Sequence, residues 1–188
     1  MELIKVINNV SERVVDDLKA KLSEGSRVSI AAASFSIYAF EALKEELENV
    51  DELRFIFTSP TFIKDKVKKE KREFFIPKLN RERNLYGSDF EIKLRNKLEQ
   101  KAIAKECANW IRRKVKFKSN VSQESMGGFI YVNGTAPYAY APFNEFTTTE
   151  LGCERGNSLY SMVQVVPSPF AEQYLNCLLY TSPSPRDS

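Results

Sequence analysis

Basic side chains recur at helical spacing in the middle of the chain. A helix is predicted over residues 90–114, and five of its cations share one sector, namely Lys93, Lys97, Lys101, Lys105 and Arg112. At 100° per residue they occupy about a third of the helix circumference, and the four lysines cover about 18 Å at 1.5 Å per residue. We call this set the cationic row. Its length and charge fit the closely spaced phosphates of a nucleic-acid backbone. The solvent-exposed face of an ordinary helix is the alternative.

Further cations lie on both sides of the cationic row. Arg113 begins a basic stretch that continues into Lys114, Lys116 and Lys118. A second basic run covers residues 64–72 and is followed by aromatic side chains, which could stack on bases. More often such aromatics anchor a loop to the core. Outside the row, the cations that we assign to nucleic-acid binding are Arg113, Lys68, Lys69 and Arg72.

The charge of the chain is strongly segregated. Residues 1–63 carry 7 basic and 11 acidic side chains, a balance of −4. Residues 64–118 carry 19 basic and 8 acidic side chains, a balance of +11. Residues 119–188 carry 2 basic and 6 acidic side chains, again −4. A basic block between two acidic thirds indicates a polyanionic partner, and a lysine-rich solvated helix is the competing interpretation.

The residue types that are missing exclude several kinds of chemistry. The 188 residues contain no histidine, which excludes Ser-His-Asp and Cys-His triads and any imidazole base. Metal sites that depend on histidine are excluded as well. No G-x-x-x-x-G-K-[ST] phosphate-binding loop occurs. Three scattered cysteines without a C-x-x-C pair argue against a disulfide framework or a zinc site. We therefore expect no cofactor and no metal in this segment.

One acidic motif leaves a catalytic alternative open. Asp89, Glu91 and Lys93 fit the E-x-K part of a divalent-metal nuclease signature. In such a site the carboxylates hold Mg²⁺ and the lysine stabilises developing charge. The pattern is short, is common in charged helices, and belongs on a strand in active nucleases.

The elements that would position these residues alternate between helix and strand. Helices are predicted at residues 10–22, 37–47 and 90–114, with another beginning at 170–176. Strands are predicted at residues 27–35, 53–60, 114–120, 128–134 and 159–166, with loop over 62–90 and 135–158. The first two strands and the helix between them form a β-α-β unit, which predicts a parallel pair. We expect one α/β domain with a mixed, largely parallel sheet and flanking helices.

Segments that would direct the chain to a membrane or out of the cell are not found in the sequence. No apolar run approaches the roughly 18 residues that cross a bilayer. The first residues, MELIKVINN, lack the basic and apolar regions of a signal peptide. The expected location is the cytoplasm.

Two long stretches resemble a known family. Residues 29–62 (SIAAASFSIYAFEALKEELENVDELRFIFTSPTF) and 74–120 resemble a phospholipase-D-like domain, the module that precedes the motor in bacterial superfamily 2, Swi/Snf-like helicases. The similarity extends more loosely through GGFIYV and FTTTELG and covers residues 1–176. It implies a DNA-engaging or regulatory module of an ATP-dependent helicase, whose motor would bind ATP and Mg²⁺ beyond residue 176.

The family's catalytic motif is not present in this chain. Active members carry H-x-K followed by Asp, and the corresponding strand here lies near residues 126–129, which hold neither histidine nor lysine. Residues 143–147 (FNEFT) resemble the downstream stretch of the family. The resemblance therefore implies the fold without the phosphohistidine chemistry. A protein-interaction module that uses the acidic outer thirds is a further alternative.

The last twelve residues differ in character from the rest. Residues 177–188, CLLYTSPSPRDS, resemble a translated sequencing adaptor. We expect this stretch to be a non-native tail that buries little, and the natural product to continue differently after residue 176.

Overall fold

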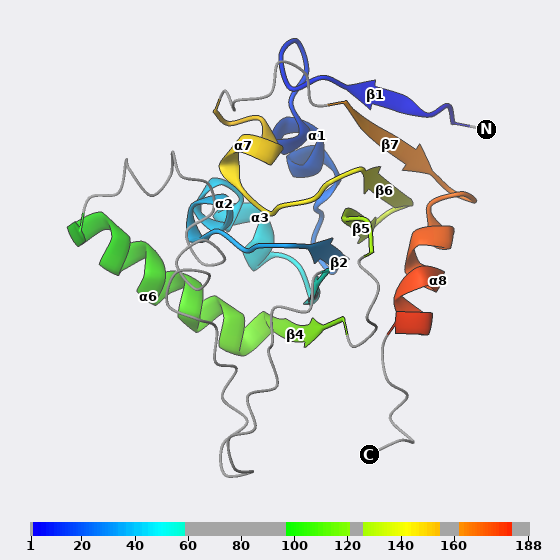
Figure 1. Ribbon diagram of the computed structural model, residues 1–188. Helices are drawn as coiled ribbons and strands as arrows, with labels where there is room; N and C mark the ends of the chain where they lie inside the picture. Colours follow the sequence, from blue (N-terminus) through cyan, green and yellow to red (C-terminus); the bar gives the residue numbers. More distant parts are fainter. Residues whose placement is uncertain (1, 59–96, 121–125, 155–161, 182–188) are drawn as a thin grey trace.

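A seven-stranded mixed sheet organises the described part of the chain. The computed structural model describes residues 2–58, 97–120, 126–154 and 162–181 (Figure 1). Its strands lie in the order β1-β7-β6-β5-β2-β3-β4. They are β1 (Lys5–Ile7), β2 (Arg27–Ala32), β3 (Glu52–Phe57), β4 (Val115–Ser119), β5 (Phe129–Asn133), β6 (Pro137–Ala141) and β7 (Val163–Pro167).

The parallel part of the sheet confirms the predicted β-α-β unit. Strand β2 pairs in parallel with β3, with Ile30 opposite Phe55, and β3 pairs in parallel with β4. The connection between β2 and β3 carries two short helices, α2 (Ile37–Ala42) and α3 (Lys44–Glu48), because the predicted single helix is interrupted at Leu43.

The sheet is not largely parallel, and that expectation was wrong. Four of its six strand pairs are antiparallel: β1–β7, β2–β5, β5–β6 and β6–β7. Strand β6 was expected to be loop, because PYAYA begins with proline and contains no β-branched residue. Its tyrosines nevertheless alternate with alanines, with Tyr140 facing the larger core cluster and Ala139 the opposite one. The expected loop also contains a helix, α7 (Thr148–Leu151).

Helices cover the two faces of the sheet unequally. Side chains of α1 (Val14–Lys21), α2, α3, α6 (Lys97–Lys114) and α7 contribute to the larger core cluster on one face. On the other face, α8 (Glu172–Thr181) covers β5 and β6 and contributes to a smaller cluster. Figure 1 shows the long α6 and the short α8 on different sides of the sheet. None of the helices in the described residues is long and apolar enough to cross a membrane.

Trp110 attaches α6 to the rest of the helical layer. Its indole is fully buried and lies 5.0 Å, between ring centroids, from Phe40 of α2. The indole Nε1 donates to the carbonyl oxygen of Leu47 at 3.1 Å, which satisfies the one polar atom of this large side chain. Ile103 and Cys107 pack on the same side of α6, where their helical spacing from Trp110 places them.

The expected tail is in part folded. Helix α8 runs from Glu172 through Thr181, and thus past residue 176. Leu178 is only 5% exposed and packs in the smaller core cluster. The expectation that this stretch buries little was therefore wrong for Leu178. The sequence pattern did not show that the smaller core cluster packs against α8.

Replacing Trp110 tests the attachment of α6. Trp110→Phe keeps an aromatic ring but removes the donor, so the carbonyl of Leu47 loses its bond. We expect a loss of about 2 kcal/mol in the free energy of unfolding, measured in urea. Trp110→Ala should lose about 3–5 kcal/mol because it also leaves a cavity. Unchanged stability of Trp110→Phe would show that the hydrogen bond contributes nothing.

Candidate nucleic-acid interface

The cationic row lies on the solvent side of α6 wherever its side chains are described. Lys101, Lys105 and Arg112 are all exposed. They fall within about 40° of one another around the helix and about 140–180° from Trp110. Because Trp110 is fully buried, the opposite side of the helix must face water. The sector of α6 that carries these three cations therefore faces solvent.

These three cations keep their charge available. Among the described residues, none of them forms an ion pair. Arg112 Nη1 makes one hydrogen bond, of 3.3 Å, to the neutral side chain of Asn109. The acidic Glu106 on the same helix is paired instead with Lys44, with Nζ and Oε2 2.9 Å apart. The face thus presents three positive charges that no described carboxylate neutralises.

Arg113 is placed differently from the row. Its two terminal nitrogens donate to the Glu48 carboxylate at 3.1 and 2.8 Å. This guanidinium holds the pKa of Glu48 below its usual range. The neighbouring Lys114 Nζ donates to the carbonyl oxygens of Glu48 and Val50, at 3.0 and 2.7 Å. Both side chains thus connect the end of α6 to the end of α3.

The remaining sequence candidates are only partly placed. Lys97 is the first residue of α6, and nothing is described of its side chain. The other assigned cations, Lys93, Lys68, Lys69 and Arg72, lie outside the described residues. The same holds for Asp89 and Glu91 of the nuclease alternative.

Lys116 and Lys118 do not continue the cationic row. In the β3–β4 register Lys116 lies opposite Arg54 and Lys118 opposite Ile56. Ile56 belongs to the core cluster on the side of α8, away from α6. Because side chains alternate along a strand, the two lysines point to that second face. The sequence predicted a strand over residues 114–120, but its pattern does not show on which face of the sheet these lysines lie.

The two stretches that carry the catalytic part of the resemblance meet in space. The Phe143 amide donates to the carbonyl of Gly128 at 2.9 Å, and the Gly128 amide donates to Asn144 Oδ1 at 3.4 Å. The carbonyl of Asn144 also accepts from the Ala33 amide at 2.7 Å, just after β2. These bonds hold β5, β2 and the segment after β6 together.

This junction leaves no space for a side chain on the strand. A Cβ atom built on Gly128 would lie 2.0 Å from the carbonyl oxygen of Phe143 and 2.8 Å from the Cα of Asn144. Both atoms belong to the backbone, so no change of side-chain rotamer can relieve the overlap. A lysine or histidine at position 128 is therefore incompatible with this backbone.

Buried polar groups at the ends of the parallel strands were missed in the sequence. Asn120 follows β4 and donates from Nδ2 to the carbonyl of Thr58 at 3.2 Å, while the Thr58 amide donates to Ala32. Ser34 is 5% exposed, and its hydroxyl has no hydrogen-bond partner among the described residues. Each of these residues comes one or two positions after a strand of the parallel part of the sheet, which is the pattern that could have revealed them.

Glu150 has the most shifted carboxyl pKa among the described residues. Burial, and secondarily the charge of Glu145, raises its pKa to about 7. Its own amide donates to the Thr147 hydroxyl at the start of α7. Among the described residues, no group of three or more cysteine, aspartate and glutamate side chains could hold a metal ion.

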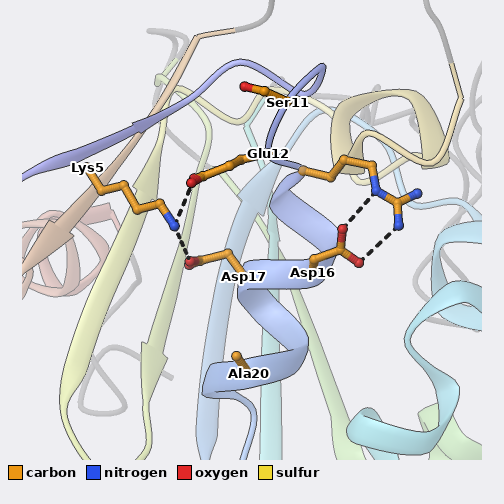
Figure 2. A pocket seen from close by; sticks show the side chains of 7 residues that line it. Lys5, Ser11, Glu12, Asp16, Asp17 and Ala20 are labelled. Atoms are coloured by element: carbon orange, nitrogen blue, oxygen red, sulfur yellow. Dashed lines mark hydrogen bonds and ion pairs between the residues drawn. The ribbon is translucent and has the colours of Figure 1, made fainter.

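A hollow beside α1 is lined by ion pairs (Figure 2). Lys5 lies between Glu12 and Asp17, at 2.8 and 3.3 Å, and Arg13 pairs with Asp16 at 2.8 Å. The hollow measures about 320 Å³. The third carboxylate of the lining is balanced from outside by Lys21, which pairs with Asp17 at 2.7 Å, so the hollow offers no unpaired charge to a ligand.

One of these carboxylates links α1 to the sheet. Asp17 accepts from the Tyr140 hydroxyl at 2.5 Å and from Lys21 Nζ at 2.7 Å. Burial alone would raise the pKa of Asp17, but these bonds outweigh burial and lower it. Because Tyr140 belongs to β6 and Lys5 to β1, this cluster serves to hold α1 on the sheet.

No family model matches the chain, and no curated protein is significantly similar to it. Function is therefore inferred from the chain's own residues and their arrangement.

The crowded junction predicts opposite behaviour for two adjacent glycines. Gly128→Ala forces the backbone of β5 away from Phe143 and should cost about 3 kcal/mol or more in unfolding free energy. Gly127→Ala is the matched control, because a Cβ there meets nothing within 4 Å, and it should change stability by less than about 0.5 kcal/mol. Equal urea midpoints for the two variants would contradict the geometry.

The pKa of Glu150 predicts how stability changes with pH. The folded state binds this proton more tightly than the unfolded state, whose glutamate has a pKa of 4.5. Stability should therefore fall as pH rises from 4.5 to about 7. Glu150→Gln removes this loss, so the variant should be more stable than the parent above that window, by about 2 kcal/mol once screening by solvent around this partly buried group is allowed for. Thermal unfolding across the pH range measures the difference, and parallel curves for both proteins would refute it.

Proposed function

We propose that this chain is a phospholipase-D-like domain that binds nucleic acid, preferably DNA, through the exposed face of α6 and performs no phosphohistidine chemistry. The observation that carries the proposal is the orientation of α6. Trp110 is buried on one side, and Lys101, Lys105 and Arg112 stand unpaired, among the described residues, on the other.

The dimensions of this face support a polyanionic ligand. Lys101 and Arg112 are eleven residues apart, which is about 17 Å along the axis at 1.5 Å per residue. Three cations over this length can follow several successive phosphates of one strand. Contacts of this kind fix position and affinity but do not distinguish bases, so we expect binding with little sequence preference.

The sheet and the strand-end junction support the phospholipase-D-like assignment. The described chain is an α/β fold with a mixed open sheet, and the stretches near residues 126–129 and 143–147 meet at its centre. A chain without histidine cannot form a phosphohistidine. The family's chemistry is thereby excluded, and the exposed cations of α6 favour binding. In the parent protein that the resemblance implies, a cytoplasmic ATP-dependent helicase, ATP and Mg²⁺ would belong to the motor.

Neutralising the α6 face tests the proposal. Lys101→Gln/Lys105→Gln removes two phosphate contacts, so the slope of log affinity against log salt for duplex DNA should become less negative by about 2. A complete row of five cations would give a slope of about −4 to −5 before mutation. Fluorescence anisotropy over a range of salt concentrations measures both values, and unfolding curves verify that the variant is folded.

A second double variant is the matched control. Arg13→Gln/Lys19→Gln changes the net charge equally but lies on the segment of α1, where both cations face carboxylates. Its salt slope should equal that of the parent chain. Equal slopes for all three proteins would overturn the α6 interface. Cleavage of the DNA in the presence of Mg²⁺ would instead favour the metal-dependent nuclease built on Asp89, Glu91 and Lys93.

A further inference from the structure

The sheet face opposite α6 carries a polar area beside α8. The registers of four strands align the side chains of this face in two rows. The first row is Asn133, Arg27 and Glu52, and the second row is Tyr131, Ser29, Arg54 and Lys116. Neighbouring side chains in such a row lie on the same face and within reach of each other.

These rows enclose a hollow. It measures about 140 Å³ and is lined by polar residues of both rows together with Leu175 of α8. A space of this size holds several water molecules. The hollow is thus large enough for a small tetrahedral anion.

The charges around the hollow favour an anion. Glu52 accepts from Arg54 Nε at 2.6 Å and from Lys116 Nζ at 3.2 Å, so one carboxylate serves two cations. The hydrogen bond from Arg54 lowers the pKa of Glu52, which therefore remains charged. Arg27 lies opposite Glu52 in the register but forms no ion pair with any described residue. Arg27 and Arg54 line the hollow and Lys116 lies beside it, whereas Glu52 and, next to Tyr131, Glu172 supply two carboxylates. One positive charge is left in surplus.

The neutral groups of the lining are suited to the same ligand. Ser29 and Tyr131 are 6% and 3% exposed, and neither hydroxyl has a hydrogen-bond partner among the described residues. Burial raises the pKa of Tyr131, so its hydroxyl remains a donor near neutral pH. Both arginines and both hydroxyl-bearing residues line the same hollow, and arginine in particular matches the geometry of phosphate oxygens.

We propose that this hollow binds a phosphate group, held by the Arg27 and Arg54 guanidinium groups and by the Ser29 and Tyr131 hydroxyls. The site lies on the other face of the sheet from the cationic row and does not depend on it. The phosphate belongs either to free inorganic phosphate or to a small phosphate monoester, and both present the same oxygens to these donors.

Titration with inorganic phosphate tests the site. In ¹⁵N-resolved NMR spectra at constant ionic strength, phosphate should shift the amide signals of β2 and β3 near Arg27 and Arg54, with a Kd of about 1 mM. Chloride at the same ionic strength should leave them unchanged. Ribose 5-phosphate distinguishes the two sources, because tighter binding than that of phosphate identifies a monoester and equal or weaker binding identifies free phosphate.

Substitutions decide whether these residues form the site. Arg27→Gln should weaken phosphate binding about tenfold or more, and it breaks no described ion pair, so the fold should remain intact. Ser29→Ala is a second variant that leaves every charge in place and should weaken binding by less. Arg13→Gln, an exposed arginine of the α1 segment, is the control and should bind phosphate like the parent chain.

Two results would overturn the site. One is the absence of phosphate-dependent shifts in β2 and β3, and the other is unaltered phosphate affinity in a folded Arg27→Gln variant. The Lys101→Gln/Lys105→Gln variant should retain phosphate binding, so failure of the α6 interface and failure of this site are separate outcomes.

Discussion

The contact between Trp110 and the α2–α3 segment fixes how the rest of the basic block is presented. The indole fills the space beside Phe40 and donates to the carbonyl of Leu47, which sets the rotation of α6 about its own axis. With 100° between successive residues, a rotation of one position would move Lys105 and Arg112 toward the sheet. Such burial would cost several kcal/mol per unpaired charge. The burial of Trp110 and the exposure of the cations therefore follow from the same orientation of α6.

The change from helix to strand at Lys114 divides the positive charge of the middle third between two faces. Lys101 and Lys105 follow the 3.6-residue period of α6, whereas Lys116 and Lys118 follow the two-residue period of β4 and point away from it. Arg113 and Lys114, at the corner between them, are bound to the end of α3. The net charge of +11 carried by residues 64–118 is thus not concentrated in one patch, because the described cations of this segment face in at least two directions.

Local periodicity predicted those elements in which the spacing of apolar residues shows which side is buried. The parallel pair β2–β3 and the buried side of α6 were found in this way, since Ile103, Cys107 and Trp110 recur at helical spacing. Strand β6 was missed because its partners, not its residue types, make it a strand. The pair Arg113–Glu48 and the approach of Gly128 to Phe143 join residues far apart in the sequence. No local pattern contains such contacts, and they determine which cations remain free and where a side chain has no space.

The junction at Gly128 bears on the proposed role of the domain. In a domain that had lost only its catalytic side chains, the strand would keep space for them. Here the backbone of Phe143 and Asn144 occupies that space and satisfies the amide and carbonyl of Gly128 by hydrogen bonds. Position 128 is therefore closed by backbone atoms, and a lysine at that position would require the segment after β6 to move. Among the described residues, two other surfaces carry unneutralised cations, the outer side of α6 and the sheet face beside α8.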